Sequence, residues 1–250
     1  MTRGPGVRPA LEGIDVAAAQ RALAESGVTD GWLPPHTVRA LLTAYGIETP
    51  ATAMAATADE AVDFAAQVGF PVAVKLASKT LTHKTDVGGV ALGVKDAAGV
   101  RAAFAAMRAA LEAKGLGDAM QGVVVQPMVP PGVELFVGVT RTPDFGPLVG
   151  FGIGGVQVEL WKDVVFRVHP LTDLDAADML AQIRAVKLLD GFRGGPVADR
   201  AAVMDALLRV DRMVGDLPTV AELDLNPLVA RAPGRGVVAV DARIRVRPAG

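Results

Sequence analysis

The chain has 250 residues, enough at roughly 150 residues per domain for one large domain or two joined subdomains, so a disordered segment is excluded as the default. Apolar residues make up 51% of the sequence and aromatic residues only 4%, so the core must consist mainly of Ala, Val, Leu and Ile. The 25 basic and 27 acidic side chains nearly cancel, which removes the basic field expected of a nucleic-acid-binding protein.

Cysteine is absent, which excludes disulfides, thiolate zinc sites and thiol nucleophiles. The sequence has no apolar stretch approaching about 18 residues, and its start lacks the apolar segment of a signal peptide. We therefore expect a soluble, cytoplasmic protein with neither a membrane nor a nucleic acid as partner.

The N-terminal part is predicted to contain a tail and two helices. Gly and Pro crowd residues 1–10, which predicts a mobile tail. Residues 11–26 predict an Ala-rich helix, and a pair of prolines opens a second predicted helix over 35–45. Residues 1–33 are thus interpreted as a flexible tail and a linker helix.

Strands and helices alternate along the rest of the chain. The predicted helices are 59–68, 97–111, 173–189 and 199–214, and the predicted strands are 71–77, 89–94, 122–129, 133–140, 147–153, 220–229 and 237–246. Several antiparallel pairs interspersed with helices, without a repeat of fixed period, predict a mixed α/β (α+β) fold in two parts.

The last two predicted strands form a hairpin with a polar face. Glu222, Asp224 and Asn226 alternate with apolar residues, so their side chains point to one side of the strand. The hairpin register places Asp241 directly opposite Asn226, close enough to share one hard cation such as Mg²⁺. A solvated face of an edge hairpin would show the same alternation. Pro227, which fixes the backbone at the end of this stripe, favours the cation site.

The predicted strand 71–77 and the loop after it form a second candidate site. Lys75 can meet a phosphate as a point charge, although lysines at strand ends often simply extend to water. The loop combines hydroxyls, two further lysines, His83 and paired glycines, which permit close backbone approach to an anion. His83 could accept a phosphoryl group as a neutral imidazole, and a surface-loop histidine is the alternative.

A third candidate is the glycine-rich turn within residues 151–159. It matches neither the dinucleotide-binding fingerprint nor the P-loop, so backbone contact with a phosphate and a plain tight connection both stay open. The other two histidines, His36 and His169, lack comparable neighbours, and no chemistry is assigned to them.

Four segments carry a resemblance in combination: GFPVAVKLASKTLTHKTDVGGV, GVVVQPMVPPGVELFVGVTRTPDFGPLVGFGIGGVQVEL, LLDGFRGGPVADR, and ELDLNPLV followed by VVAVDARIR. They resemble the ATP-grasp domain of the ADP-forming acyl-CoA synthetases, the acetate–CoA ligases distantly related to succinyl-CoA synthetase. The resemblance covers about residues 35–250. It implies an ATP-grasp fold of two α+β subdomains with the nucleotide between them, an N-terminal subdomain over 34–121 and a C-terminal subdomain over 122–250.

The same resemblance implies an acid–thiol ligase reaction, ATP + carboxylic acid + CoA ⇌ ADP + phosphate + acyl-CoA, with Mg²⁺. Lys75 would contact ATP phosphates, and His83 would relay a phosphoryl group between the nucleotide and a CoA-binding partner domain. The remaining implied nucleotide-binding residues are Gln126 and Met128, which would meet adenine, and Glu134 in the same pocket.

The metal ligands of related ATP-grasp enzymes map onto Asn226 and Asp241, with Asp224 beside them and Glu222 as the next candidate. This assignment agrees with the hairpin geometry, which needs no knowledge of the family.

A departure from the family concerns the CoA-binding domain, for which 250 residues leave no room. The resemblance therefore implies either a nucleotide subunit whose α partner binds CoA and the small carboxylic acid, or a split or truncated form that retained its linker. One alternative is a regulatory ATP-binding module of an acyltransferase system; the joint presence of Lys75, His83, Asn226 and Asp241 argues against it. Another is a different ATP-grasp carboxylate ligase, which would not need His83. The acid used, the choice of ATP or GTP and the direction stay open.

Overall fold

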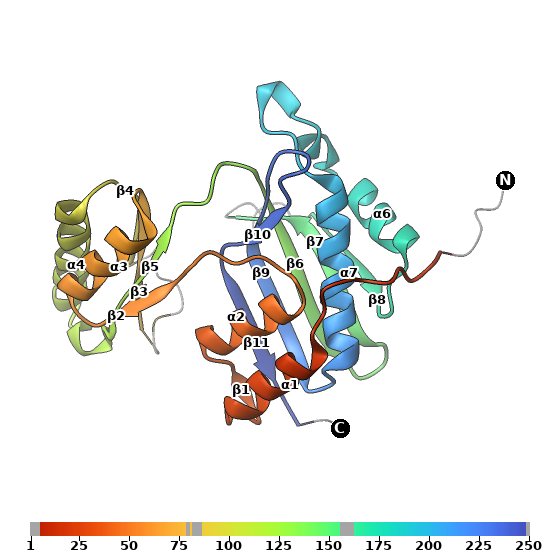
Figure 1. Ribbon diagram of the computed structural model, residues 1–250, viewed down its shortest axis with the longest axis horizontal. Helices are drawn as coiled ribbons and strands as arrows, with labels where there is room; N and C mark the ends of the chain where they lie inside the picture. The colour runs from red at the N-terminus through yellow and green to blue at the C-terminus, as the bar shows by residue number, and fades with distance from the viewer. Residues whose placement is uncertain (1–5, 79–80, 82–86, 156–162, 249–250) are drawn as a thin grey trace. The chain divides into compact units, whose positions relative to one another are not determined.

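The computed structural model of the protein describes residues 6–78, 81, 87–155 and 163–248 (Figure 1). The chain divides into two compact units: unit 1 comprises Met1–Thr49 and Pro130–Gly250, and unit 2 comprises Pro50–Val129. Each unit combines helices with an antiparallel sheet, so the predicted mixed α/β class is confirmed. No helix in the described part of the chain is long and apolar enough to cross a membrane.

Unit 1 is built on a seven-stranded sheet in the order β1-β11-β9-β6-β7-β8, with β10 pairing β9 beside this path. Every pairing is antiparallel. The strands are β1 Gly31–Trp32, β6 Val133–Thr142, β7 Gly146–Ile153, β8 Val164–Val168, β9 Val220–Ala230, β10 Val237–Ala239 and β11 Ala242–Val246. The sequence did not predict β1 and β8, because β1 has two residues and β8 is a short edge strand.

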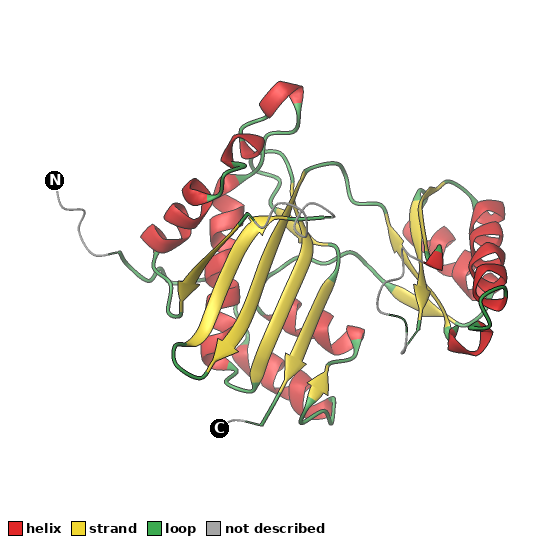
Figure 2. Ribbon diagram, turned by 180° about the vertical axis from the view of Figure 1, so that it is seen from behind, coloured by secondary structure: helices red, strands yellow, loops and turns green. Residues whose placement is uncertain are grey.

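The helices of unit 1 pack on one face of this sheet. They are α1 Val16–Glu25, α2 Pro35–Ala44, α6 Asp173–Gln182 and α7 Arg200–Asp216, with the 3₁₀ turns η3 Val186–Leu189 and η4 Phe192–Gly194. Their apolar residues share one core with the inward-facing residues of the strands. In Figure 2 the sheet lies in front of these helices, so the face of the sheet that points toward the viewer carries none of them.

The predicted helix over 173–189 is interrupted in the structure. Thr172 caps α6 in a capping box with Asp175, as its sequence favours. At Ile183 the backbone becomes extended, and the buried Asp163 accepts hydrogen bonds from the next two backbone N–H groups, both at 2.8 Å. Because these N–H groups are satisfied by a side chain distant in sequence, the helix ends there and only η3 follows.

Unit 2 has a four-stranded antiparallel sheet in the order β2-β5-β3-β4. Its elements are β2 Ala53–Ala55, α3 Ala58–Val68, β3 Val72–Ala77, β4 Val90–Val94, α4 Ala97–Glu112, η2 Gly117–Ala119 and β5 Gly122–Pro127. Helices α3 and α4 pack on one face of the sheet (Figure 2). The apolar positions of α4 are buried, namely Val100, Phe104, Met107 and Leu111.

The borders of the compact units differ from the subdomain borders expected from the sequence. The strand expected to open the C-terminal subdomain, β5, pairs with β3 from Val72↔Pro127 to Ala77↔Gly122 and so belongs to unit 2. Helix α2, expected in the N-terminal subdomain, belongs to unit 1, because its apolar side is buried in the core of the large sheet.

The N-terminal segment is not the free tail that its composition predicted, at least over its described residues. The N–H of Val7 donates to Asp173 Oδ1 at 2.7 Å, and the N–H of Asp173 donates to the carbonyl of Val7 at 2.9 Å. The linker helix α1 packs against α2, with Ala19 fully buried. Asp173, the first residue of α6, thus holds this segment against the rest of unit 1 by paired hydrogen bonds. Residues 1–5 lie outside the described part of the chain.

Candidate functional site

The polar stripe predicted on the C-terminal hairpin lies on β9. Leu223 and Leu225 are buried in the core, whereas Glu222, Asp224 and Asn226 are half-buried on the other side of the strand. This is the face of the large sheet that the helices of unit 1 leave uncovered (Figure 2). The alternation of the sequence therefore translates directly into a polar sheet face.

The predicted hairpin register is confirmed. Arg243 pairs with Asp224 in the ladder between β11 and β9. Asp241 lies opposite Asn226, whose N–H donates to the carbonyl of Asp241 at 3.1 Å. The expected continuous strand over 237–246 is instead divided into β10 and β11, with Asp241 at a bend between them. Opposite this break lies Pro227, which has no N–H to donate to the ladder.

Asp224 is the electrostatically unusual member of this face. Its Oδ1 is buried and has no hydrogen-bond partner within the described part of the chain. Burial raises the pKa of Asp224 above the ordinary aspartate value, the Asp241 carboxylate raises it further, and the Arg243 guanidinium lowers it. A buried carboxylate oxygen without a donor, next to a second carboxylate, is the arrangement that a bound cation would satisfy.

The glycine-rich turn approaches the same face. The N–H of Gly155 donates to Asn226 Oδ1 at 2.9 Å, and the N–H of Gly154 donates to the carbonyl of Glu134 at 2.9 Å. A Cβ added at Gly154 would collide with the backbone of Leu135, and one added at Gly155 would collide with the Glu134 carboxylate. The turn thus needs glycine for a close approach, a contact that its sequence alone left open.

Glu222, the fourth candidate ligand, is held by arginines. Arg245 contacts its Oε1 at 3.0 Å, and Arg247 does so at 3.7 Å. Because these cations already neutralise the carboxylate, Glu222 is a weaker ligand candidate than Asp224, Asn226 and Asp241.

The chemistry of Asp224, Asn226 and Asp241 fits Mg²⁺. This ion takes oxygen ligands from one or two carboxylates and completes its coordination with water and phosphate oxygens. Asn226 Oδ1 accepts one hydrogen bond from Gly155 and keeps a second lone pair. The described residues contain no cluster of three or more His, Cys, Asp and Glu side chains suited to a metal, so a site here depends on the amide of Asn226.

Unit 2 holds the other predicted nucleotide-binding residues. Lys75 on β3 pairs with Val124, and Ala73 pairs with Gln126, so Lys75 and Gln126 are diagonal neighbours. Both lie on the face of the small sheet opposite the core residues Val74 and Val125. The structure therefore brings Lys75 and Gln126 to one face.

Met128 and Glu134 occupy different settings. Met128 follows β5, is 37% exposed, and its N–H donates to the carbonyl of Pro71 at 3.0 Å. Glu134 is an exposed residue of β6 in unit 1. A pocket shared by Glu134, Gln126 and Met128 stays a prediction, and His83 lies outside the described residues.

One interaction of His169 was missed by the sequence analysis. Its Nδ1 lies 2.8 Å from Oδ1 of Asp211, a buried residue of α7, and its ring lies against Gly215. His169 and Asp211 line a cavity of about 300 Å³ together with Arg8 and other residues near the N-terminus. No local signal could have revealed this contact, because Asp211 follows His169 by 42 residues and sits within a helix.

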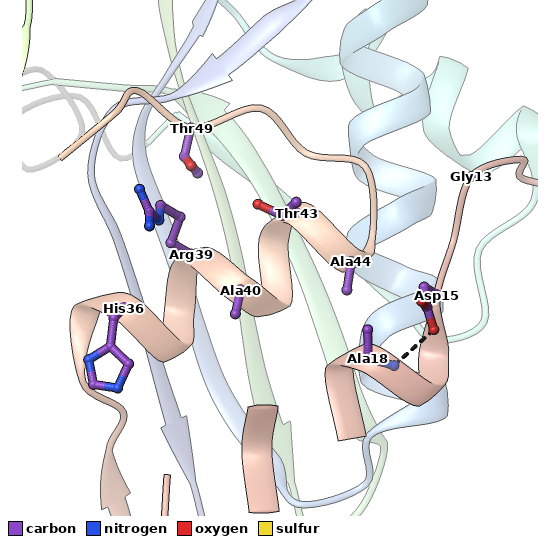
Figure 3. A pocket seen from close by; sticks show the side chains of 9 residues that line it. All are labelled: Gly13, Asp15, Ala18, His36, Arg39, Ala40, Thr43, Ala44 and Thr49. Carbon is purple, nitrogen blue, oxygen red and sulfur yellow. Dashed lines mark hydrogen bonds between the residues drawn. The ribbon is translucent and has the colours of Figure 1, made fainter. Parts of the chain in front are cut away.

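A larger hollow of about 580 Å³ lies beside α2 and contains none of the predicted site residues (Figure 3). Its lining includes His36, Arg39 and Thr43 from the exposed side of α2. In Figure 3, Arg39 extends toward the segment that carries Thr49, whereas His36 points away from it. The hollow offers no paired acid and base, and we assign it no chemistry.

Comparison with known proteins identifies the family. The profile of the ATP-grasp domain matches residues 22–246. The β subunit of acetate–CoA ligase (ADP-forming) II from Pyrococcus furiosus is 39% identical over 84% of this chain and 89% of its own length. The acetate–CoA ligase (ADP-forming) I of Archaeoglobus fulgidus is 43% identical over 79% of this chain, but this covers only 29% of that longer protein.

Solved structures agree with these sequence matches. Acetyl-CoA synthetase 1 from Candidatus Korarchaeum cryptofilum, in complex with CoA and the nucleotide analogue AMPCP, has a TM-score of 0.81 at 39% identity, covering 93% of this chain and all of the compared one. A second structure of that enzyme, with CoA and Mg-AMPPCP, has its phosphohistidine segment pointing towards the nucleotide binding site; its TM-score is 0.76 at 38% identity over the same shares of the two chains. The protein therefore belongs to the ATP-grasp family and has its fold.

Proposed function

We propose that the chain is the nucleotide-binding subunit of an ADP-forming acid–CoA ligase, which converts ATP, a carboxylate and CoA into ADP, phosphate and acyl-CoA. The observation that carries the proposal is the polar face of β9, where Asp224, beside Asp241 and Asn226, has a buried oxygen with no partner in the described part of the chain. The similarity to the Pyrococcus β subunit over most of both chains supports the same assignment.

In this proposal, Asp224, Asn226 and Asp241 bind Mg²⁺ and, through the ion, the phosphates of ATP. The ion, when bound, would neutralise phosphate charge and orient the phosphates. Asn226 is fixed for this task by its hydrogen bond from Gly155. Phosphoryl transfer depends chiefly on positioning and charge neutralisation, which such a preorganised oxygen set can provide.

The residues of unit 2 and Glu134 complete the proposed nucleotide site. Lys75 supplies a positive charge for the phosphates, and Gln126 and Met128 contact the adenine. Lys75 and Gln126 share one sheet face, which supports a common ligand. The role of Glu134 is to line the same site from its exposed position on β6.

His83 is the proposed phosphoryl carrier. A ring nitrogen would attack the γ-phosphorus of ATP in line, forming a nitrogen–phosphorus bond while the bond to the leaving oxygen of ADP breaks. A carboxylate oxygen of the acid would then take the phosphoryl group, so that the nitrogen–phosphorus bond breaks and an acyl phosphate forms. The sulfur of CoA would attack the acyl carbon and release phosphate. The phosphohistidine segment of the Korarchaeum enzyme, which points to the nucleotide site of that protein, supports this role.

The proposed partner is an α subunit that binds CoA and a small carboxylic acid. The relatives that this chain matches over most of their length are β subunits, which implies further subunits in those enzymes. The single-chain ligase from Archaeoglobus is much longer than the matched part. The segments beyond this match would correspond to the partner.

Nucleotide binding by the purified protein tests the proposal. Titration calorimetry with ATP should show binding that weakens strongly when EDTA removes Mg²⁺. Asp241→Asn should lose this Mg²⁺ dependence, because it removes one of two ligand carboxylates and preserves the shape of the side chain. The matched control, Asp144→Asn, changes an exposed aspartate in the β6–β7 turn of the same unit and should leave binding unchanged. A wild-type protein that binds no nucleotide, or an unaffected Asp241→Asn variant, would contradict the proposal.

A further inference from the structure

A cation stands directly beside the proposed metal site. Arg243 on β11 is the ladder partner of Asp224 on β9, and cross-strand partners share one face of a sheet. The next residue, Ile244, is fully buried in the core, so the exposed Arg243 points to the opposite, uncovered side of the sheet. Asp241 precedes Arg243 by two residues and lies at the bend before β11.

Arg243 differs from the arginines that follow it on the same face. Arg245 and Arg247 each form an ion pair with Glu222. Within the described part of the chain, Arg243 has no ion pair or hydrogen bond through its guanidinium, although its charge acts on Asp224. Among the described residues, the buried Oδ1 of Asp224 also has no hydrogen-bond partner. The two groups lie near each other and interact through their charges, but they form no ion pair.

We infer that Arg243 is a phosphate-binding residue of the nucleotide site, an assignment that rests on the proposed function. The guanidinium of Arg243 and the Oδ1 of Asp224 have no hydrogen-bond or ion-pair partner among the described residues. A ligand suited to both groups must carry both signs of charge. A polyphosphate with its divalent cation meets this requirement, because Asp224 and Asp241 would hold the cation and Arg243 would bind a phosphate oxygen. The planar fork of arginine suits such oxygens, to which it can donate two parallel hydrogen bonds.

The charge of the polar face supports this role. Asp224 and Asp241 would repel the phosphates of ATP, and the two cations at Glu222 are already paired. Arg243 would offset this repulsion at the position of the metal ligands.

The test compares wild type with Arg243→Gln, Arg243→Lys and the control Arg247→Gln. Dissociation constants are measured by calorimetry for Mg·ATP at saturating Mg²⁺ and for adenosine, and Mn²⁺ alone is titrated by electron paramagnetic resonance. Arg243→Gln should weaken Mg·ATP binding by about tenfold or more, the loss of a charge-assisted contact. It should leave adenosine affinity unchanged and bind Mn²⁺ at least as tightly as wild type, because a like charge is removed.

Arg243→Lys should recover part of the Mg·ATP affinity, and Arg247→Gln should match wild type. Equal Mg·ATP affinity in wild type and Arg243→Gln would overturn the inference while leaving the proposed function intact. Tighter Mn²⁺ binding by Arg243→Gln without weaker Mg·ATP binding would also overturn the inference, because Arg243 would then affect only the charge at Asp224. An equal loss of adenosine affinity would show a general structural defect and also reject the role. If the wild type itself fails to bind Mg·ATP, the proposed function falls first, and the inference falls with it.

Discussion

At the scale of single residues, Asp224 carries a conflict between stability and function. A folded protein gains nothing from a half-buried carboxylate whose Oδ1 has no partner, and burial together with Asp241 raises its pKa. Such a residue is tolerated where a ligand resolves the conflict. Arg243 does not resolve it, because the two side chains form no ion pair in the structure.

Replacing Asp224 by asparagine should therefore stabilise the ligand-free protein at neutral pH, by on the order of 1 kcal/mol. The sign follows from the raised pKa: the ionised form is penalised in the folded state, and the penalty fades as the pH falls through that raised pKa. The same variant should lose the stabilisation by Mg·ATP. Chemical denaturation with and without Mg·ATP measures both effects, with Asp144→Asn as control. A ligand-free variant that is less stable than wild type would show that the carboxylate is satisfied after all.

The alternation around Asp224 and Asn226 was readable from the sequence because a strand has a period of two. The atoms that form hydrogen bonds or ion pairs with these side chains could not be predicted from the sequence. The hydrogen bond from Gly155 to Asn226 spans 71 residues, and the predicted register sets Arg245 opposite Glu222 without showing that the two side chains form an ion pair. The sequence thus predicted which residues share the face, and only the fold shows which of them remain unpaired.

At the scale of elements, Asp199 joins helix α7 to the turn of the C-terminal hairpin. Its carboxylate accepts the N–H of Ala202 at 3.1 Å, as an N-cap, and the N–H of Gly236 at 3.0 Å. The hydrogen bond from Gly236 is the largest cause of a pKa below the ordinary aspartate value. The ionised form is therefore favoured in the folded state.

Asp199→Asn should lower the thermal midpoint at neutral pH, because asparagine retains the capping geometry but lacks the charge. A lowered pKa contributes stability above the unfolded value, about 3.9 for aspartate, and this contribution is lost as the pH falls through the folded value. The difference between wild type and variant should therefore shrink below about pH 4. Thermal unfolding at pH 7 and at pH 3 measures it; a difference that stays constant with pH would argue against the charge. The control is Asp96→Asn, which changes the N-cap aspartate at the exposed start of α4 in the same way.

The glycine turn after β7 gives a second prediction at this scale. Gly154→Ala places a methyl group against the backbone of Leu135, which cannot move without disturbing β6. We expect loss of stability and weaker Mg·ATP binding, since the displaced Gly155 no longer fixes Asn226. Gly117→Ala, whose methyl group meets chiefly the flexible Glu112 side chain, is the control. Circular dichroism and calorimetry measure the two effects, and an undisturbed Gly154→Ala protein would contradict the role of the turn.

At the scale of the whole molecule, the sequence predicted the class of fold and most elements, and the subdomain borders that it predicted differ from the borders of the two compact units. Strand β5 has no local mark that assigns it to either sheet; its six-residue pairing with β3 decides the matter. Likewise, only the packing of α2 on the large sheet shows that residues before the small unit belong to unit 1. Long-range pairing, which local periodicity does not encode, accounts for both differences.

The proposed division of labour between subunits predicts the activity of the isolated chain. On its own it should bind Mg·ATP but form no acyl-CoA from a carboxylate, because it lacks the proposed CoA-binding partner. Addition of a cognate α subunit should produce acyl-CoA and ADP together, measured by chromatography. Synthesis of acyl-CoA by the isolated chain would contradict this division.

The central claim is that ATP bound by this chain gives its γ-phosphoryl group to His83. The direct measurement is incubation with Mg²⁺ and γ-labelled ATP, alone and with the α subunit, followed by a search for acid-labile, base-stable label. We predict label in wild type and in His36→Asn but none in His83→Asn. A wild-type protein that binds Mg·ATP yet takes up no label under either condition, or a His83→Asn variant that is labelled like wild type, would contradict the account.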